Sequence, residues 1–240
     1  MAGSPPDFDH FITANEHGFY CVPESFRGRE VPRLLRRGEV YEPATLRFLS
    51  RHVGSGDIVT GGAFVGDFFP ALARAMAPGA RIRSFEPAPD TFAAALHTIA
   101  LNGLDNVELS QVAVGAEDAV LPLQVARPGA SEPLAAGARI VAEAGKGQTI
   151  DVPVVTIDSL VPADRTVSLL HLDVEGHEIP ALQGAVELIA RDAPILVLET
   201  GKRKRRIEYL DFLGEAVPQH RYIHTSQIEE NGIFIPTAAV

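Results

Sequence analysis

The sequence predicts an α/β protein built on a doubly wound, mostly parallel sheet, and three observations support this fold class. From Asp57 onward, short apolar runs alternate with amphipathic stretches over most of the chain. A glycine-rich turn follows the first apolar run, and an acidic residue follows the second. Residues 172–178, LDVEGHE, follow a later run and are unusually acidic. In sheets of this kind, the carboxyl ends of the strands form the ligand-binding edge.

The composition excludes several function classes. Apolar residues make up 46% of the 240-residue chain, which is typical of a folded core. The net charge of −10 disfavours binding to nucleic acid and to anionic membranes, and no apolar run is long enough to span a bilayer. Residues 1–7 lack the features of a signal peptide, and Cys21 is the only cysteine. We therefore expect a cytoplasmic protein without intrachain disulfides.

The individual elements follow from apolar periodicity and from helix start and stop signals. We predict parallel strands over residues 57–61, 81–85, 107–112, 167–172 and 195–198, and a closing strand pair over 221–224 and 232–235. We predict helices over residues 67–76, 89–101, 179–190 and 203–213. Pro89 suits the first turn of its helix, and Asn102 with Gly103 ends it. The basic run 202–206 is expected to be a solvated helix start or an anion contact.

Two segments depart from the alternating pattern. Residues 1–50 form a mixed leader, expected to pack on the main domain, and a helix introduced by Pro43 covers about residues 41–53. Within the main domain, residues 51–240, the segment 115–158 is expected to be an insertion. Its strands, 120–125 and 151–157, would extend a sheet edge. The glycine- and alanine-rich stretch 127–147 would be a mobile tip over a site or a plain surface loop.

The turn after the first strand, residues 61–66, has the sequence GGAFVG. Glycines let a backbone approach a ligand closely, and the following helix N-terminus is locally positive. A dinucleotide fingerprint requires glycine at its first, third and sixth positions. Neither the frame starting at Gly61 nor the frame starting at Gly62 has this spacing, so an NAD- or nucleotide-sugar-dependent enzyme is disfavoured.

Glu86 follows the second predicted strand, about 20 residues after Gly66. An acidic side chain in this position can accept hydrogen bonds from both hydroxyls of a ribose. The alternative is an exposed loop carboxylate beside Pro87. A glycine turn after the first strand and an acid after the second together indicate adenosine binding.

Five segments occur in a characteristic order: 41–45 (YEPAT), 62–66 (GAFVG), 85–89 (FEPAP), 172–178 (LDVEGHE) and 198–199 (LE). Over residues 41–200 this ordered set resembles the FkbM family of S-adenosylmethionine-dependent methyltransferases. The resemblance implies a Rossmann-like seven-stranded methyltransferase sheet, mostly parallel with one antiparallel strand near the edge. It also implies S-adenosyl-L-methionine as the cofactor, with residues 51–240 as the methyltransferase domain.

The resemblance further implies which residues would hold the cofactor. Gly62, Ala63 and Gly66 would line its methionine portion. Glu86 would hold the ribose, and Pro87 would shape the adenine pocket.

The resemblance also concerns further positions around the expected cofactor pocket. Ala113, which follows the third strand, could approach the adenine, and Glu42 matches a glutamate near the cofactor or is simply a helix-start carboxylate. The family usually has aspartate where this chain has Thr60 and asparagine where it has Phe64, and a lysine is often found in place of His171. These departures would affect the amino-acid end of the cofactor and leave the ribose contact intact.

The acidic turn supplies the candidate catalytic groups. His177 is a natural general base, because the pKa of histidine lies near neutrality, and Asp173 could orient that base, contact the cofactor or bind a metal. A divalent cation between Asp173 and Glu199 is chemically reasonable, although no spacing requires it. Glu175 and Glu178 could instead complement the start of the following helix.

The favoured hypothesis is an enzyme that methylates a hydroxyl oxygen on a natural product or glycan-type small molecule. The alternative is a catalytically degenerate binding or scaffold protein, and the support for it is the change at Thr60 and Phe64. Methylation at nitrogen or carbon is a further option. The expected partner is a small-molecule acceptor, with neither nucleic acid nor membrane, and the leader and insertion offer surfaces for a homodimer.

Overall fold

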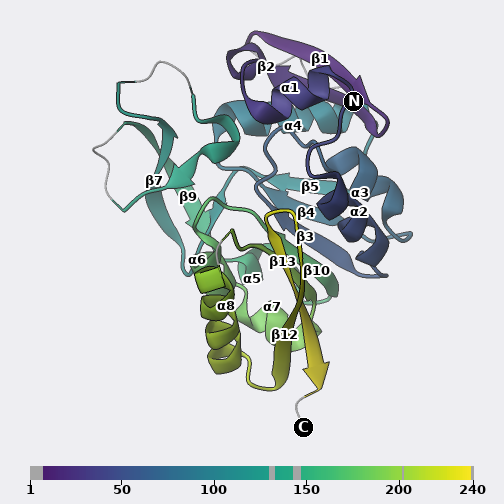
Figure 1. Ribbon diagram of the computed structural model, residues 1–240, viewed down its shortest axis with the longest axis vertical. Coiled ribbons are helices and arrows are strands. Elements are labelled where there is room, and N and C mark those ends of the chain that lie inside the picture. The colour runs from purple at the N-terminus through teal and green to yellow at the C-terminus, as the bar shows by residue number, and fades with distance from the viewer. Residues whose placement is uncertain (1–7, 130–132, 143–146, 202, 239–240) are drawn as a thin grey trace.

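A seven-stranded sheet forms the centre of the protein in this computed structural model, which describes residues 8–129, 133–142, 147–201 and 203–238 (Figure 1). The strand order is β12-β13-β11-β10-β3-β4-β5. The strands are β3 (Asp57–Gly61), β4 (Ile82–Phe85), β5 (Val107–Ser110), β10 (Val167–Leu172), β11 (Ile195–Glu199), β12 (His220–Ile228) and β13 (Asn231–Ala238). Strand β13 runs antiparallel to both neighbours, whereas the pairs from β11 to β5 are parallel. The predicted mostly parallel sheet with one reversed strand near its edge is therefore confirmed.

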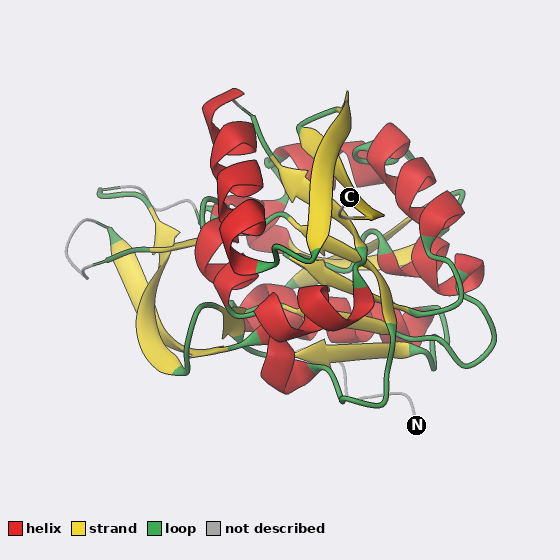
Figure 2. Ribbon diagram, turned by 90° about the horizontal axis from the view of Figure 1, so that it is seen from below, coloured by secondary structure: helices red, strands yellow, loops and turns green. Residues whose placement is uncertain are grey.

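Helices cover both faces of this sheet (Figure 2). They are α2 (Pro43–His52), α3 (Phe69–Ala75), α4 (Pro89–Leu101), α5 (Ile157–Leu160), α6 (Glu178–Gln183), α7 (Val186–Asp192) and α8 (Arg203–Ala216). Successive strand residues point to opposite faces, so Ile58 and Leu169 pack with α2 and α3, while Val59 and Leu170 pack with α6, α7 and α8. Both faces of the strands are buried, which explains why their sequences are continuous apolar runs.

The single helix predicted over residues 179–190 is wrong, because the structure has two helices, α6 and α7, with a break at Gly184. A Cβ atom at Gly184 would lie 2.0 Å from the carbonyl oxygen of Gly115, so the chains meet too closely for any side chain. Asp158 then starts α7 by accepting hydrogen bonds from the backbone N–H groups of Glu187 (3.0 Å) and Leu188 (2.8 Å). This contact is tertiary, so local periodicity does not reveal it.

The leader contains a hairpin, β1 (His10–Asn15) and β2 (Gly18–Pro23), then a 3-10 turn, η1 (Glu24–Phe26), and α1 (Glu30–Arg36). The hairpin packs on α4, whose side chains bind the free edge of β2. The N–H of Phe19 donates to Oδ1 of Asn102 (3.0 Å), and the N–H of Cys21 donates to Oγ1 of Thr98 (3.1 Å). These bonds satisfy backbone groups that an edge strand would otherwise leave unpaired.

The insertion forms a sheet of its own, so the expectation that its strands extend a sheet edge is wrong. This second sheet has the order β6-β9-β7-β8 and consists of β6 (Ala113–Val114), β7 (Ala119–Ala126), β8 (Arg139–Ile140) and β9 (Gln148–Val155). Its inner face has a separate apolar cluster that includes Leu123, Val152 and Val154. Within the predicted tip 127–147, residues 130–132 and 143–146 lie outside the described residues.

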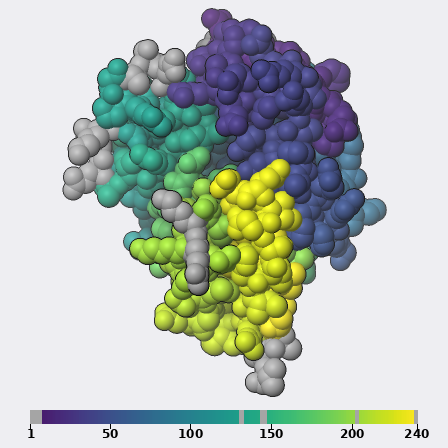
Figure 3. Space-filling view, viewed as in Figure 1, coloured from purple at the N-terminus to yellow at the C-terminus, as the bar shows by residue number. Residues whose placement is uncertain are grey.

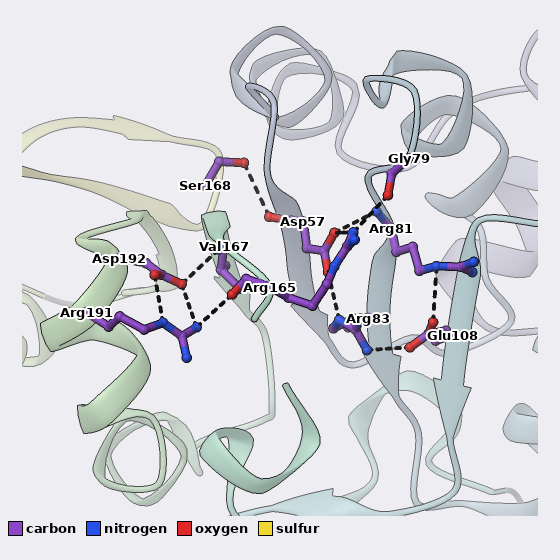
Figure 4. Close-up of polar contacts among 10 residues, drawn as sticks. All are labelled: Asp57, Gly79, Arg81, Arg83, Glu108, Arg165, Val167, Ser168, Arg191 and Asp192. Carbon is purple, nitrogen blue, oxygen red and sulfur yellow. Dashed lines mark hydrogen bonds and ion pairs between the residues drawn. The ribbon is translucent and has the colours of Figure 1, made fainter. Parts of the chain in front are cut away.

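Figure 4 shows an ion-pair network at the amino ends of the strands, opposite the predicted ligand edge. The carboxylate of Asp57 is fully buried and accepts hydrogen bonds from Nε of Arg83 (2.8 Å) and Nε of Arg165 (3.0 Å). The backbone N–H of Arg81 donates to it as well (2.9 Å). The network joins β3, β4 and the segment before β10, and it has a structural role.

Among the helices that the structure describes, none has the length and apolar content needed to span a membrane.

Candidate active site

The carboxyl ends of β3 and β10 meet at the point where the strand order reverses, because β4 and β5 lie on one side of β3 and β10 lies on the other. Gly61 is in register with Leu172, so the two following turns lie side by side. Gly62 has a φ of +77°, and a Cβ atom on it would lie 2.1 Å from the carbonyl oxygen of Asp173. The glycine turn and the acidic turn, which are distant in sequence, are therefore in direct backbone contact.

A cavity opens at this switch point. The predicted site residues that line it are Glu42, Gly62, Ala63, Glu86, Pro87, Ala113, Asp173 and His177. The structure thus brings together every predicted catalytic and cofactor residue except Gly66, which is absent from the lining and packs against Phe69. The leader (purple) and the insertion (teal) are adjacent on one face (Figure 3), and residues of both contribute to the wall, among them Val31 and Arg139.

Glu86 lies at the end of β4 and is held by the glycine turn. Its Oε2 accepts a hydrogen bond from the N–H of Phe64 (2.9 Å), and its Oε1 accepts one from the N–H of Ala88 (3.0 Å). The residue is 7% exposed, and burial raises the pKa of its carboxyl to about 7. Thr91 adds a side-chain hydrogen bond to this carboxyl, and the lone-pair capacity that remains can accept a hydrogen bond from a ligand hydroxyl.

Thr60 and His171 form a buried pair in the cavity wall. Oγ1 of Thr60 lies 2.9 Å from Nδ1 of His171, and the ring of Phe68 stacks on the imidazole with 6.0 Å between centroids. Burial lowers the pKa of His171 to about 4, so the imidazole is neutral at pH 7. Its Nε2 has no partner at strict hydrogen-bond geometry among the described residues, although the side chain of Asn231 is near enough to raise the pKa of His171 and so to oppose the effect of burial. The pair adds polarity to the wall without adding charge.

Asp67 is a cavity residue that the sequence analysis missed. It follows Gly66 directly, and its position in the turn before α3 was the available signal. Burial raises the pKa of Asp67 to about 7, and the negative charge of Glu42 acts in the same direction. Burial also raises the pKa of Asp173 well above its ordinary value, with further contributions from Glu199, Glu175 and Glu42. Raised values at several neighbouring carboxyls identify a part of the wall that suits a positively charged group.

Glu178 does not line the cavity but holds the acidic turn through hydrogen bonds. It is 2% exposed, and its Oε1 accepts hydrogen bonds from the N–H groups of Val174 (3.2 Å) and Gly176 (3.0 Å). Its Oε2 accepts one from Nη1 of Arg205 (2.7 Å), on helix α8. The basic run therefore provides an anion contact inside the protein. Glu178 supports the turn, while Glu175, with a φ of +53°, reaches the cavity.

Of the proposed metal pair, Asp173 lines the cavity and Glu199 lies close enough to raise the pKa of Asp173. Glu199 is absent from the cavity lining, and its Oε2 lies 3.6 Å from Nη1 of Arg205. In the part of the chain that the structure describes, no group of three or more histidine, cysteine, aspartate or glutamate side chains could hold a metal ion. Metal dependence stays an open prediction for Asp173 and Glu199.

His177 is the cavity residue best suited to accept a proton. It precedes α6, is partly buried, and lies beside Gly115, where an added Cβ atom would approach its Nε2 to 3.5 Å. Burial lowers the pKa of His177 below its ordinary value, and the charge of Glu178 opposes this effect. The imidazole is therefore neutral, and able to act as a base, at pH 7.

The strand order, with β13 reversed between β11 and β12, is the sheet arrangement of a methyltransferase fold, and the cavity lies at its β3–β10 switch point. Residues 60–226 match the family model of the methyltransferase FkbM domain. The chain therefore belongs to the FkbM methyltransferase family. No curated protein matches it.

Solved structures agree on the fold. The methyltransferase FkbM from Methylobacillus flagellatus is 15% identical with a TM-score of 0.53, over 76% of this chain and 44% of that one. A putative rRNA-methylase from Clostridium thermocellum is 13% identical with a TM-score of 0.51, and the match covers 84% of this chain and 97% of that one. Trm5b from Pyrococcus abyssi is 11% identical with a TM-score of 0.51, and the match covers 97% of this chain and 56% of that one. The chain thus spans less than half of the M. flagellatus protein, and at these identities the likeness concerns the fold alone.

Proposed function

We propose that the chain transfers the methyl group of S-adenosylmethionine to a hydroxyl oxygen of a natural product or glycan-type small molecule. The observation that carries this proposal is one continuous cavity. The adenosine-type residues Gly62 and Glu86 line it together with a neutral imidazole, that of His177. Methyl transfer to a hydroxyl requires these two functions side by side, since the acceptor must lose a proton near the bound cofactor.

The residues present fit the cofactor. When bound, S-adenosylmethionine supplies an electrophilic methyl group on a sulfonium. Glu86 would accept hydrogen bonds from the ribose, while Pro87 and Ala113 would border the adenine. Gly62 lines the cavity, and its φ of +77° lets the turn bend beside the methionine portion.

Carboxylates beside the glycine turn replace the charge that Thr60 lacks. Asp67 and Asp173 lie in the same wall as Glu42, and either can attract the ammonium group of the methionine portion. We therefore assign Asp173 to the charged end of the cofactor and His177 to the acceptor proton.

Calorimetry with S-adenosylhomocysteine, the demethylated product, tests the first half of the proposal. We expect binding to the wild-type chain and about 10- to 100-fold weaker binding to Glu86→Gln, because an ionised acceptor is lost and an amide donor faces two backbone N–H groups. Glu117→Gln, at an exposed position away from the cavity, should bind like the wild type. Absence of binding to the wild-type chain would refute the proposal. Binding without methylation of any hydroxylated acceptor would favour the alternative of a degenerate binding protein.

Substitution of His177 tests the second half. In His177→Gln we expect kcat to fall about 100-fold or more, with unchanged affinity for S-adenosylhomocysteine, because the base is lost and the cofactor pocket is not. The pKa of His177 is lowered, so the wild-type rate should be constant above about pH 6.5 and fall as pH drops through that lowered value. A pH–rate profile of kcat measures this. A variant that keeps both the wild-type kcat and the acidic limb would exclude His177 as the base.

A further inference from the structure

The cavity wall carries more carboxyl groups than the one net positive charge of the cofactor can pair with. Five carboxyl side chains line it: Glu42, Asp67, Glu86, Asp173 and Glu175. Arg139 is the only lysine or arginine in the lining that the described residues provide. S-adenosylmethionine has a sulfonium, an ammonium and a carboxylate, and so contributes one net positive charge at neutral pH. Burial raises the pKa of all five carboxyls, to about 7 for Asp67 and Glu86, so these two are only partly ionised at neutral pH and a cation beyond the cofactor would favour their charged forms.

Of these five carboxyls, Glu175 is the one that the cofactor contacts proposed above do not use. Glu175 and His177 belong to the same short turn, and both line the cavity. A left-handed backbone at Glu175 (φ +53°) and at Gly176 (φ +94°) gives this turn its sharp bend, which Glu178 and Arg205 secure. The carboxylate of Glu175 is thus held close in sequence to the proposed base, at a fixed place on the wall.

A second observation is independent of the acidic residues. His171 is 5% exposed and lines the same cavity, and among the described residues its Nε2 has no partner at strict hydrogen-bond geometry, with the Asn231 side chain the nearest polar group that affects it. A buried ring nitrogen without a partner is costly unless a ligand or water satisfies it. The wall thus offers a neutral polar atom together with carboxylates, a combination that suits a ligand with hydroxyl and ammonium groups.

We propose, on the basis of the proposed function, that the acceptor is a hydroxylated molecule bearing a protonated amine, such as an amino sugar, and that Glu175 contacts this amine. An anionic acceptor would place its charge against carboxylates that already repel one another. Burial, followed by the charges of Glu199 and Glu178, raises the pKa of Glu175 despite the opposing effect of Arg139 and Arg205. The nearby cations therefore do not cancel the effect of burial and of acidic neighbours on the pKa of Glu175. A ligand ammonium beside this carboxylate would favour its ionised form.

A matched set of monosaccharides tests this inference. The chain is loaded with S-adenosylhomocysteine, and saturation-transfer NMR measures the dissociation constants of glucosamine, N-acetylglucosamine and glucuronate. We expect glucosamine to bind at least about tenfold more tightly than glucuronate, with the neutral sugar between them. In Glu175→Gln most of this preference should disappear. Glu16→Gln removes the same charge from an exposed position outside the cavity and should leave the preference unchanged.

The outcomes separate this inference from the proposed function. If S-adenosylhomocysteine binds but glucosamine shows no binding, or binds no better than glucuronate, the inference is overturned and the methyltransferase proposal stands. If the preference survives in Glu175→Gln, the assigned contact is wrong. A repeat with added Mg²⁺ provides one more check, because a glucuronate preference that appears only with Mg²⁺ would mean that the carboxylates serve a cation instead.

Discussion

Replacing Gly62 with alanine is expected to lower the free energy of unfolding by about 2–4 kcal/mol and to abolish binding of S-adenosylhomocysteine. Gly62 has a φ of +77°, a conformation that costs an L-residue energy, and the new Cβ atom would lie 2.1 Å from the carbonyl oxygen of Asp173. The obstacle is backbone, so no side-chain rotation can relieve it. Either the glycine turn or the acidic turn must move, and both line the cavity. Urea denaturation and calorimetry measure the two effects.

Gly79 provides the matched control for this substitution. Its φ is +84°, and an added Cβ atom would have nothing within 4 Å. Gly79→Ala should therefore cost only the backbone strain, about 1 kcal/mol, and leave the affinity for S-adenosylhomocysteine unchanged. If both variants lose equal stability and both bind the ligand normally, the close contact between the two turns does not exist.

Replacing Asp57 with asparagine is expected to lower the free energy of unfolding by about 3 kcal/mol, without changing the affinity for the cofactor product. The side chain of Asp57 is 1% exposed, and its removal as an anion takes away the ion-pair partner of Arg165 and leaves Arg83 paired with Glu108 alone (Figure 4). The side chain of Arg165 is 31% exposed, so water offsets part of the loss, and we take the lower end of the range for broken buried pairs. The midpoint of urea denaturation, at constant slope, measures the change.

The pH dependence of stability provides a second measurement. Burial raises the pKa of Asp57, but hydrogen bonds from Arg165 and Arg83 outweigh this effect and hold the pKa below its ordinary value. A depressed pKa stabilises the fold above the unfolded-state value, about 4, and this contribution is lost as pH falls through the folded-state pKa. The stability of Asp57→Asn should therefore fall less than that of the wild type as pH decreases through this range. Glu24→Gln, which breaks an ion pair whose side chains are both 43% exposed, should show no measurable change in stability. Equal acid sensitivity in wild type and Asp57→Asn would contradict the network.

Much of the site could be predicted because its parts follow strands directly. Gly62, Glu86 and Asp173 each come just after an apolar run, and parallel strands place their carboxyl ends at one edge. The order of the segments then indicated the family, and the family model over residues 60–226 confirms it. These signals are local in sequence and need no knowledge of long-range contacts.

Other features depend on contacts between distant segments. The pKa of Asp67 is raised by burial and by the charge of Glu42, which is distant in sequence. The position of Glu178 depends on the hydrogen bond that it accepts from Arg205 on α8. The break between α6 and α7 follows from the approach of Gly184 to Gly115. No periodicity reports such contacts, because each is set by how separate elements pack.

By itself, the sequence determined the alternation of strands and helices, the polar residues that end each strand, and the family, because these depend on patterns a few residues long. Only the tertiary structure decided that the insertion forms its own sheet and that the glycine turn touches the acidic turn. It also decided that Asp67, Asp173 and Glu175 share one cavity wall with His177. Burial and mutual repulsion then change the protonation of these carboxyls, and both effects arise only when the folded chain brings them together.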